Sequence, residues 1–257
     1  MTRRFLAVCV AVLAAPAASG QDLPGTERYT LRLEYGRWHP GLDGQIQKGL
    51  GDSEGTLLEL TDDLGVADES TWELRGTIRL GASVKLRGAY IPLDKYQGDT
   101  VAQTNFFYGG QQFFAGEHVV TSLDGKFYRG EIQWDFQKGA GGFVGVYLGA
   151  KVFDVASVVV APDSGKRVIE DALIPIPVLG LSGRTYQGRF SVEGDFSGMT
   201  AGSRGHVWEV SLYGRVHLSD RLAVGGGYHR VSFEGKDDRD FVSIKLRGWS
   251  YAVELSL

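Results

Sequence analysis

Histidine and serine residues are the first candidates for chemistry in this 257-residue chain. His217 and Ser219 stand two positions apart, and alternate residues of a strand share one face, so a base and a nucleophile would lie side by side there. The surrounding segment, "LSDRL", is also typical of an ordinary hairpin turn. We therefore predict no catalytic residue, and we keep a lipid hydrolase that uses His217 and Ser219 as an alternative function.

Other catalytic, metal-binding and phosphate-binding motifs are scattered or incomplete. Asp62 and Asp63 would need His118 to form an acid–base set, but they lie in different polar segments. The five histidines, at positions 39, 118, 206, 217 and 229, lack the spacing of a metal site, and no helix is expected after the glycine-rich segment 224–230 to make a phosphate loop. The sequence thus predicts no metal and no cofactor. A formal net charge of −4 without a basic run predicts no nucleic-acid partner.

Charged residues that alternate with apolar ones form a larger and more regular set. In "TWELRGTIRLGASVKLRGAY", residues 71–90, apolar side chains recur at every second position and charged ones stand between them. If the apolar face of such strands meets lipid, the charged face lines the interior of a barrel. The predicted inward charges are Arg32, Glu34, Glu73, Arg75, Arg79, Lys85, Arg87, Arg129, Glu131, Asp135, Arg184, Glu193, Asp195, Glu209, Arg215, Lys245 and Arg247.

The state of this charged interior has two alternatives. Buried charges must be paired and hydrogen-bonded, or else hydrated. A barrel of about ten strands is narrow enough for side chains to fill. The charges therefore form either a closed ion-pair network or a hydrated path that would slightly favour anions, because basic residues outnumber acidic ones in the set. We predict the closed network.

The segments that carry these charges have the pattern of membrane-length strands. Alternating segments recur from Arg28 to the C-terminus, and several approach the roughly ten residues that cross a membrane at a tilt. Glycine is frequent, with 37 residues, and proline is rare, with 7, and beyond the N-terminus no apolar run approaches the ~18 residues of a membrane helix. We predict an all-β, antiparallel up-and-down transmembrane barrel of about ten strands, with eight or twelve as alternatives.

The links between these segments alternate between short and long. Outer-membrane barrels have short periplasmic turns and longer outer loops, so we expect a tight turn at Gly81-Ala82 and long outer loops at about 41–69, 93–121 and 155–174. Within the second loop, "NFFYGGQQFF" predicts a hairpin that turns at Gly109-Gly110. Aromatic residues near segment ends, such as Trp72 and Tyr90, indicate interfacial girdles.

The N-terminus has the pattern of a secretory signal peptide. A basic start at Arg3-Arg4 precedes a short apolar stretch over 5–15 and the small residues of Ala18-Ser19-Gly20. This predicts a signal peptide over 1–20, cleaved after Gly20, and a single barrel domain over 21–257. The only cysteine, Cys9, lies in the signal, so the mature chain would have no disulfide or thiolate chemistry.

With these features the chain resembles small bacterial outer-membrane β-barrel proteins over nearly all of its mature length. The resemblance also includes the final segment, "SYAVELSL", although Ala252 and Leu257 replace the glycine and terminal aromatic residue usual in that group. It implies export to the outer membrane of a Gram-negative bacterium. It also implies that outer-membrane lipid, lipopolysaccharide and, during biogenesis, the barrel-assembly machinery are partners. It transfers no functional residue.

The sequence therefore predicts a non-enzymatic outer-membrane barrel that is structural, surface-exposed or a narrow channel. Besides the lipid hydrolase, a soluble periplasmic lipocalin-like barrel would fit the same alternation if the charges faced outward and the aromatic residues inward. The face on which Arg75, Arg79 and Arg87 lie distinguishes these alternatives.

Overall fold

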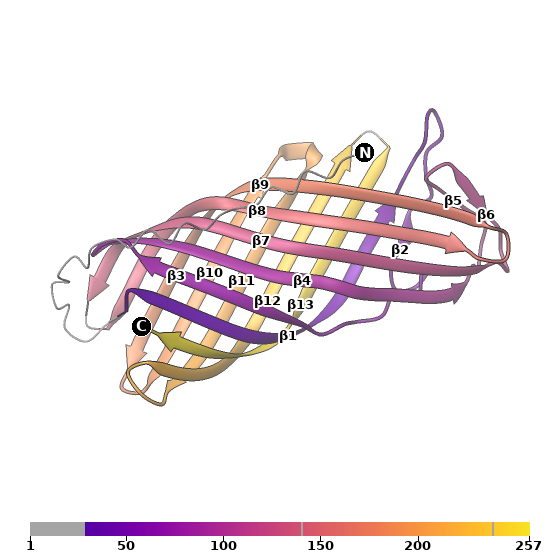
Figure 1. Ribbon diagram of the computed structural model, residues 1–257. Coiled ribbons are helices and arrows are strands. Elements are labelled where there is room, and N and C mark those ends of the chain that lie inside the picture. The colour runs from indigo at the N-terminus through magenta and orange to yellow at the C-terminus, as the bar shows by residue number, and fades with distance from the viewer. Residues whose placement is uncertain (1–28, 140, 238) are drawn as a thin grey trace, which may run out of the picture.

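The chain folds into a closed barrel of ten antiparallel strands (Figure 1). The computed structural model describes residues 29–139, 141–237 and 239–257. The wall strands are β1 (Leu31–Gln47), β3 (Thr71–Arg79), β4 (Val84–Val101), β7 (His118–Gly139), β8 (Gly142–Ala161), β9 (Lys166–Gln187), β10 (Phe190–Thr200), β11 (Gly205–His217), β12 (Leu222–Asp237) and β13 (Asp240–Ser256). Each pairs with the next, and β13 pairs with β1 to close the barrel. The predicted fold class and strand number are confirmed.

Strict alternation along the strands separates an inner face from an outer face. In β1, even-numbered residues such as Arg32 and Glu34 are buried, whereas odd-numbered Leu33 and Tyr35 are exposed. The barrel therefore carries charges inside and apolar side chains outside, the reverse of a soluble ligand-binding barrel. Because an apolar outer face needs lipid around it, the lipocalin-like alternative does not fit this structure.

The tight turns gather at one end of the barrel, as expected for the periplasmic end. There β3 joins β4 across 80–83, β9 joins β10 through Gly188 and Arg189, and β11 joins β12 across 218–221. Gly188 has φ of 58°, a conformation that glycine adopts without strain. The backbone amide of Thr30 bonds to the Leu257 carbonyl, so the first described strand and the C-terminus also meet at this end.

The outer end is more regular than the long loops expected over 41–69, 93–121 and 155–174. The segment 155–174 is not a loop. β8 continues to Ala161 and β9 starts at Lys166, because the apolar run "VASVVV" can pair with the alternating "KRVIED" across a four-residue turn. β1 likewise continues to Gln47, β4 to Val101, and β7 begins at His118. The outer loops are therefore shorter, and the walls taller, than predicted.

Two short structures cover the outer end. The predicted hairpin at Gly109-Gly110 is confirmed as β5 (Phe106–Tyr108) and β6 (Gln111–Phe113), with the rings of Phe106 and Phe113 stacked 4.6 Å apart. The other covering structure is the segment that follows β2 (Leu58–Glu59). β2 pairs with β1, and the segment after it places Leu60 and Leu64 in the interior. A 3-10 turn, η1 (Gly202–Arg204), links β10 to β11.

An apolar core fills the barrel above the level of the charges. It is built from inward side chains of the tall walls and from the covering segments. The rings of Phe127 and Phe153 stack at 4.8 Å, and Phe153 also stacks on Phe233 at 5.2 Å, which joins β7, β8 and β12 across the interior. The tall walls persist above the membrane because this core buries their inner face.

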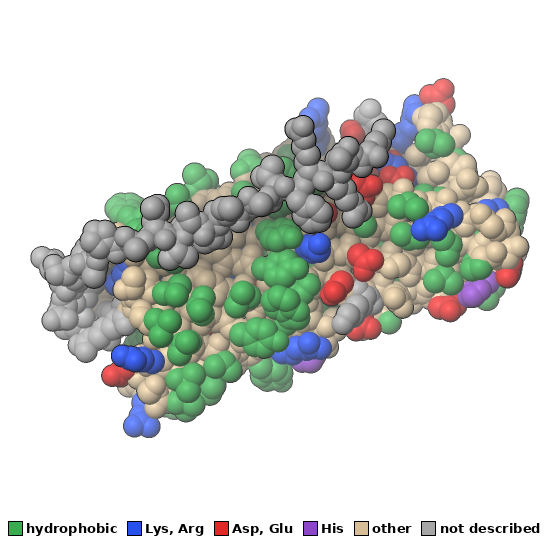
Figure 2. All heavy atoms as spheres, viewed as in Figure 1, with side chains coloured by type: hydrophobic (Ala, Val, Ile, Leu, Met, Phe, Trp, Pro, Cys, Tyr) green, Lys and Arg blue, Asp and Glu red, His purple; other side chains and the backbone are tan. Residues whose placement is uncertain are grey.

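The outer surface has a broad apolar belt bounded by aromatic residues. In Figure 2 hydrophobic side chains gather over the left part of the barrel, and acidic and basic side chains are more frequent toward the right. At the outer boundary the ring centroids of Tyr35 and Trp72 lie 6.2 Å apart, those of Trp72 and Tyr90 5.3 Å, and those of Tyr90 and Tyr128 5.1 Å. These four aromatic residues, which include Trp72 and Tyr90, thus lie at one level on four adjacent strands, as expected for an interfacial girdle.

Among the described residues, no helix is long and apolar enough to cross a membrane, a finding that does not bear on strands. The predicted signal peptide over 1–20 lies outside the described residues.

Candidate functional site

The predicted charges meet inside the membrane-level part of the barrel. Apart from Lys245 and Arg247, every member of the predicted set lies on the inward face of its strand, buried or nearly so. They come from β1, β3, β4, β7, β9, β10 and β11, so the network joins most of the wall. The stripe of Arg75, Arg79 and Arg87, on β3 and β4, faces the interior.

The prediction that Lys245 and Arg247 face inward is wrong. From Leu246 to Glu254 the buried positions of β13 are the even ones, and Ile244 packs on the apolar core, so Lys245 and Arg247 face outward with Trp249 and Tyr251. These two basic residues share their parity with the lipid-facing aromatic residues of the same strand, and that parity identifies them as outward.

The predicted set omitted a carboxylate, a lysine and a histidine of the interior. Glu254, Lys151 and His229 are buried at the level of the network. Glu254 alternates with the lipid-facing Val253 and Leu255, and this parity identifies it as inward. Lys151 lies in a segment that is apolar on both faces, which gave no signal, and His229 stands between the outward residues Tyr228 and Arg230.

Glu34 and Arg215 form the centre of one half of the network. Both guanidinium groups of Arg215 and Arg75 contact the Glu34 carboxylate, Arg75 at 2.9 Å. Arg75 also forms a two-point contact with Glu73, with N–O distances of 2.5 and 2.6 Å. Arg215 further reaches Glu193 at 2.8 Å, and two-point and shared contacts of this kind hold a guanidinium in a fixed orientation.

Glu209 is the centre of the other half. It accepts from Arg129 at 2.6 Å and from His229 at 2.9 Å, and it also contacts the Lys151 ammonium. Lys151 donates in addition to Ser197 at 2.6 Å. Because His229 also approaches Glu73 at 4.0 Å, it connects the two halves of the network.

A third group of contacts ties β4 and β7 to β10. Arg87 contacts Asp195 at 2.7 Å and donates to Gln133 at 2.8 Å. Gln133 in turn donates to Asp135 at 2.6 Å, and Asp135 pairs with Lys85 at 2.8 Å. The remaining cation of this end, Arg184, forms a two-point contact with Glu254 at 2.9 and 3.1 Å.

The charges of the interior nearly cancel. Nine cations face eight anions at this level: Arg32, Arg75, Arg79, Lys85, Arg87, Arg129, Lys151, Arg184 and Arg215 against Glu34, Glu73, Glu131, Asp135, Glu193, Asp195, Glu209 and Glu254. The basic excess in the predicted set came from Lys245 and Arg247, which face outward, and from the omission of Glu254. A lumen whose charges nearly cancel does not attract anions over cations.

Little space is left between these side chains. The cavity bounded by Arg32, Glu34, Arg75, Thr77, Arg87, Glu193, Asp195 and Arg215 has a volume of about 20 Å³. That is room for about one water molecule. The network is sealed on its outer side by Trp38, whose ring stacks on His229 at 4.5 Å and begins the apolar core above. The lumen is thus filled twice, by charges and then by apolar side chains.

The residues singled out for catalysis do not form the predicted sets. Ser219 accepts the backbone amide of Leu222 at 3.1 Å within its own turn, while His217 lies instead beside Ser191, with 2.9 Å between Nε2 and Oγ. Arg184 donates to the same Ser191 oxygen at 3.1 Å. Among the described residues no carboxylate is hydrogen-bonded to His217, so the pair lacks the group that would orient the imidazole.

The acidic residues of the outer end remain separate as well. Asp63 accepts the backbone amide of Glu59, a local turn contact at 2.8 Å, whereas His118 lies 2.7 Å from Asp99. Within the described part of the chain, no group of three or more His, Cys, Asp or Glu residues is placed to hold a metal ion.

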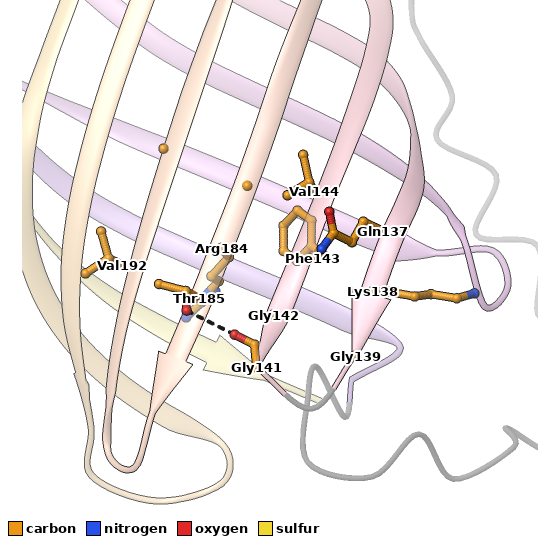
Figure 3. A pocket seen from close by; sticks show the side chains of 12 residues that line it. Gln137, Lys138, Gly139, Gly141, Gly142, Phe143, Val144, Arg184, Thr185 and Val192 are labelled. Atoms are coloured by element: carbon orange, nitrogen blue, oxygen red, sulfur yellow. Dashed lines mark hydrogen bonds between the residues drawn. The ribbon is translucent and has the colours of Figure 1, made fainter.

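A larger pocket, of about 480 Å³, opens at the periplasmic end beside the turn between β7 and β8 (Figure 3). Its wall includes Phe143, Val144 and Val192, and Thr185 donates to the Gly141 carbonyl at 3.0 Å across it. Of its charged residues, Lys138 donates to Ser83 at 2.7 Å and Arg184 is held by Glu254. The pocket therefore offers a glycine-rich, mostly apolar surface without a base or nucleophile.

The fold is similar to that of a solved outer-membrane protein, and two further solved structures match it less closely. The outer membrane protease OmpT from Escherichia coli matches with a TM-score of 0.60 at 10% sequence identity, over 90% of this chain and 99% of that chain. The translocator domain of the autotransporter NalP from Neisseria meningitidis matches with a TM-score of 0.47 at 13% identity, over 92% and 90%. The Pseudomonas putida toluene transporter TodX gives 0.37 at 9% identity, over 90% of each chain.

At this identity the likeness to OmpT concerns the fold and not the activity. The sequence matches no known protein family, and no curated protein is significantly similar to it. The closed barrel, the apolar belt and the aromatic girdle, together with the fold shared with OmpT, place the chain in the outer membrane of a Gram-negative bacterium.

Proposed function

We propose that this chain is a non-enzymatic, closed outer-membrane barrel that acts at the cell surface through its outer end. The observation that carries the proposal is the doubly filled lumen: an ion-pair network at membrane level, with a cavity of only about 20 Å³, and an apolar core above it. A path for solutes would have to break both layers. The lumen is then structural, and the tall walls and covering segments are the parts that face the medium.

The tall side of the barrel supports a surface role. β7, β8 and β9 extend well beyond the aromatic girdle, and β8 joins β9 there in a turn at 162–165 (Figure 1). This turn is fixed to the neighbouring connection because Lys166 donates to both carboxylate oxygens of Glu117, at 2.6 and 2.9 Å. An outer end of this size and order provides a stable surface for contact with molecules outside the cell.

Cysteine accessibility tests the sealed lumen. Ser211 lies inward on β11 at the level of the network, and Ser219 lies exposed in the periplasmic turn. In a chain without Cys9, Ser211→Cys is expected to resist a small, charged, thiol-specific reagent in the folded barrel, whereas the near-isosteric change Ser219→Cys reacts rapidly. Both variants should react fully after unfolding. Rapid labelling of Ser211→Cys in the folded barrel would show that water and solutes reach the interior.

A second candidate function is an outer-membrane lipid hydrolase that uses Ser191 as nucleophile and His217 as base. The observation that favours it is the 2.9 Å contact between Ser191 Oγ and His217 Nε2, beside the Arg184 guanidinium. If it operates, overexpression changes the cell's phospholipid or lipid A profile, and Ser191→Ala abolishes the change while the barrel still folds. The closed-barrel proposal expects identical lipid profiles for the wild-type protein, Ser191→Ala and an empty vector.

A further inference from the structure

Four basic residues lie on the outside of the barrel, at the aromatic girdle or just beyond it. Arg230 on β12 and Arg247 on β13 face outward and are exposed, and Lys245 lies two residues beyond Arg247 on β13. Arg37 on β1 is also exposed and faces Tyr251 in the register, nearer the periplasm than Arg247. We call these four residues the basic patch. They lie on three adjacent strands, since β12 pairs with β13 and β13 with β1.

The two central arginines stand directly opposite each other. In the register of β12 and β13, Arg230 pairs with Arg247. Side chains of such directly opposed residues begin only about 5 Å apart, and like charges in that position repel. Within the described part of the chain, none of the four residues of the basic patch makes an ion pair or a side-chain hydrogen bond. Such a pair is stabilised when an anion binds between the two guanidinium groups.

The acidic groups around the basic patch leave the central pair uncompensated. Asp43 stands opposite Lys245 across β1 and β13. Asp68 lies over Gly41, which is the residue opposite Arg247, but its Oδ1 already accepts the backbone amide of Leu42 at 2.7 Å. Neither carboxylate lies within ion-pair distance of a patch guanidinium.

The position of the arginine pair along the membrane normal indicates which anions surround it. Two pairs nearer the periplasm in the same register, Tyr228 faces Trp249, and the centroids of their rings lie 5.5 Å apart. Two residues of a strand span roughly 7 Å, so the arginine pair lies just outside the aromatic level. Aromatic girdles lie at the level of lipid headgroups, so the groups that surround Arg230 and Arg247 are those headgroups.

The opposite wall shows that this arrangement is local. On β7, Lys126 is also outward and also lies two residues beyond a girdle residue, Tyr128. In the register it faces Asp154 of β8, an opposite charge. A basic residue at headgroup level is thus compensated on that wall. Among the paired strands that the structure describes, only β12 and β13 present two directly opposed arginines.

We propose that Arg230 and Arg247, supported by Arg37 and Lys245, form a binding site for the phosphate groups of an outer-leaflet glycolipid. Arginine binds phosphate oxygens through two parallel N–H donors, and two facing guanidinium groups can hold one phosphate group between them. The adjacent rings of Trp249, which is 64% exposed, and Tyr228 provide the surface for the sugar and acyl parts of the same lipid. The site lies on the outer wall and is independent of whether the lumen is closed.

Binding of purified lipopolysaccharide to the full barrel, reconstituted in phospholipid nanodiscs, tests the site. The double variant Arg230→Gln/Arg247→Gln is expected to bind about 30-fold more weakly than the wild type, since each basic residue at a membrane surface contributes a factor of about five. The matched control Lys126→Gln should change affinity less than twofold. Arg230→Lys/Arg247→Lys should bind at an intermediate level, because it keeps the charge and loses the two-point contact. Heat-modifiable migration checks that each variant is folded.

Two further binding measurements identify the ligand. Dephosphorylated lipopolysaccharide should bind the wild type and the double glutamine variant equally weakly. Inorganic phosphate at millimolar concentration should compete only slightly, because it lacks the lipid part. Equal binding of phosphorylated lipopolysaccharide by wild type and folded double variant would overturn the proposal. Inorganic phosphate that binds as tightly as the lipid would overturn its assignment to a glycolipid.

Discussion

At the scale of single residues, the interior depends on shared partners rather than on isolated pairs. Glu209 serves two cations and His229, and Glu34 serves two arginines, so each carboxylate compensates more than one buried charge. Buried ion pairs add little net stability compared with apolar packing, but the loss of one partner leaves an uncompensated charge in a water-poor site. Single charge deletions in this network should therefore be costly.

Glu209→Gln should lower the free energy of unfolding by about 3–5 kcal/mol, because Arg129 and Lys151 lose their main counter-charge in a buried site. Urea unfolding in lipid vesicles, followed by tryptophan fluorescence, measures the change. Glu234→Gln on β12 is the matched control, because Glu234 is outward, 40% exposed and 3.9 Å from His206. That change should cost less than about 1 kcal/mol. Equal effects of the two substitutions would contradict the idea of a buried network.

The outer end gives a prediction about pH. The two hydrogen bonds from Lys166 lower the pKa of Glu117 below its ordinary value. A depressed folded-state pKa means that the carboxylate stabilises the fold at a pH above the unfolded pKa, and that this contribution is lost as the pH falls through the lowered value. Carbon-13 NMR titration of Lys166→Gln should show the Glu117 pKa rising toward the ordinary value. Arg167→Gln, which changes the neighbouring basic residue, should leave it unchanged.

At the scale of elements, the strands were predictable and their outer ends were not. Period-two alternation located the strands, and the turn at Gly109-Gly110 located the β5–β6 hairpin. The continuation of β8 and β9 through 155–174 depends on the apolar core inside them, which forms from residues far apart in sequence such as Phe153 and Phe233. No local pattern in the sequence shows that core. The polar residues within 162–171 therefore led to the prediction of a loop.

The hairpin at the outer end gives an element-scale prediction. Gly109 has φ of 53°, and a methyl group added there would lie 2.5 Å from a Val168 methyl group. Gly109→Ala should therefore detach the hairpin from β9 and make 102–117 sensitive to protease while the barrel stays folded. Gly116→Ala is the control, because Gly116 has φ of 88° but no neighbour within 4 Å of the added methyl. It should cost only the backbone strain, about 1–2 kcal/mol. Equal protease resistance of wild type and Gly109→Ala would contradict the packing of this hairpin.

The position of the membrane along the strands gives a second element-scale prediction. Leu148 on β8 is 63% exposed within the apolar belt, and Ile169 on β9 is 55% exposed beyond the girdle. Arginine at the middle of the bilayer should destabilise the barrel by about 2–4 kcal/mol, whereas above the membrane the cost should be near 0–1 kcal/mol. Unfolding of Leu148→Arg and Ile169→Arg in lipid vesicles compares the two. A larger loss for Ile169→Arg would mean that the belt is placed wrongly.

At the scale of the whole molecule, the sequence predicted the architecture, most of the interior and a closed network of charges, but not which charges pair. The membrane-length strands, the closed barrel and the inward stripe of Arg75, Arg79 and Arg87 follow from alternation. The pairing of those charges does not, because it depends on residues brought together across the lumen, such as Arg32 with Glu193 and Arg129 with Glu209. Outward basic residues were also assigned to the interior, which hid the near-neutral balance of the lumen.

Conductance across a planar lipid bilayer tests the closed lumen most directly. The ion-pair network and the apolar core fill the barrel in succession, so the inserted wild-type protein should give no stable conductance steps above the bilayer background at either polarity. Insertion is checked by heat-modifiable migration of the same preparation. Reproducible steps of fixed size from the folded wild-type protein would contradict the closed barrel and show that a hydrated path runs through the charges.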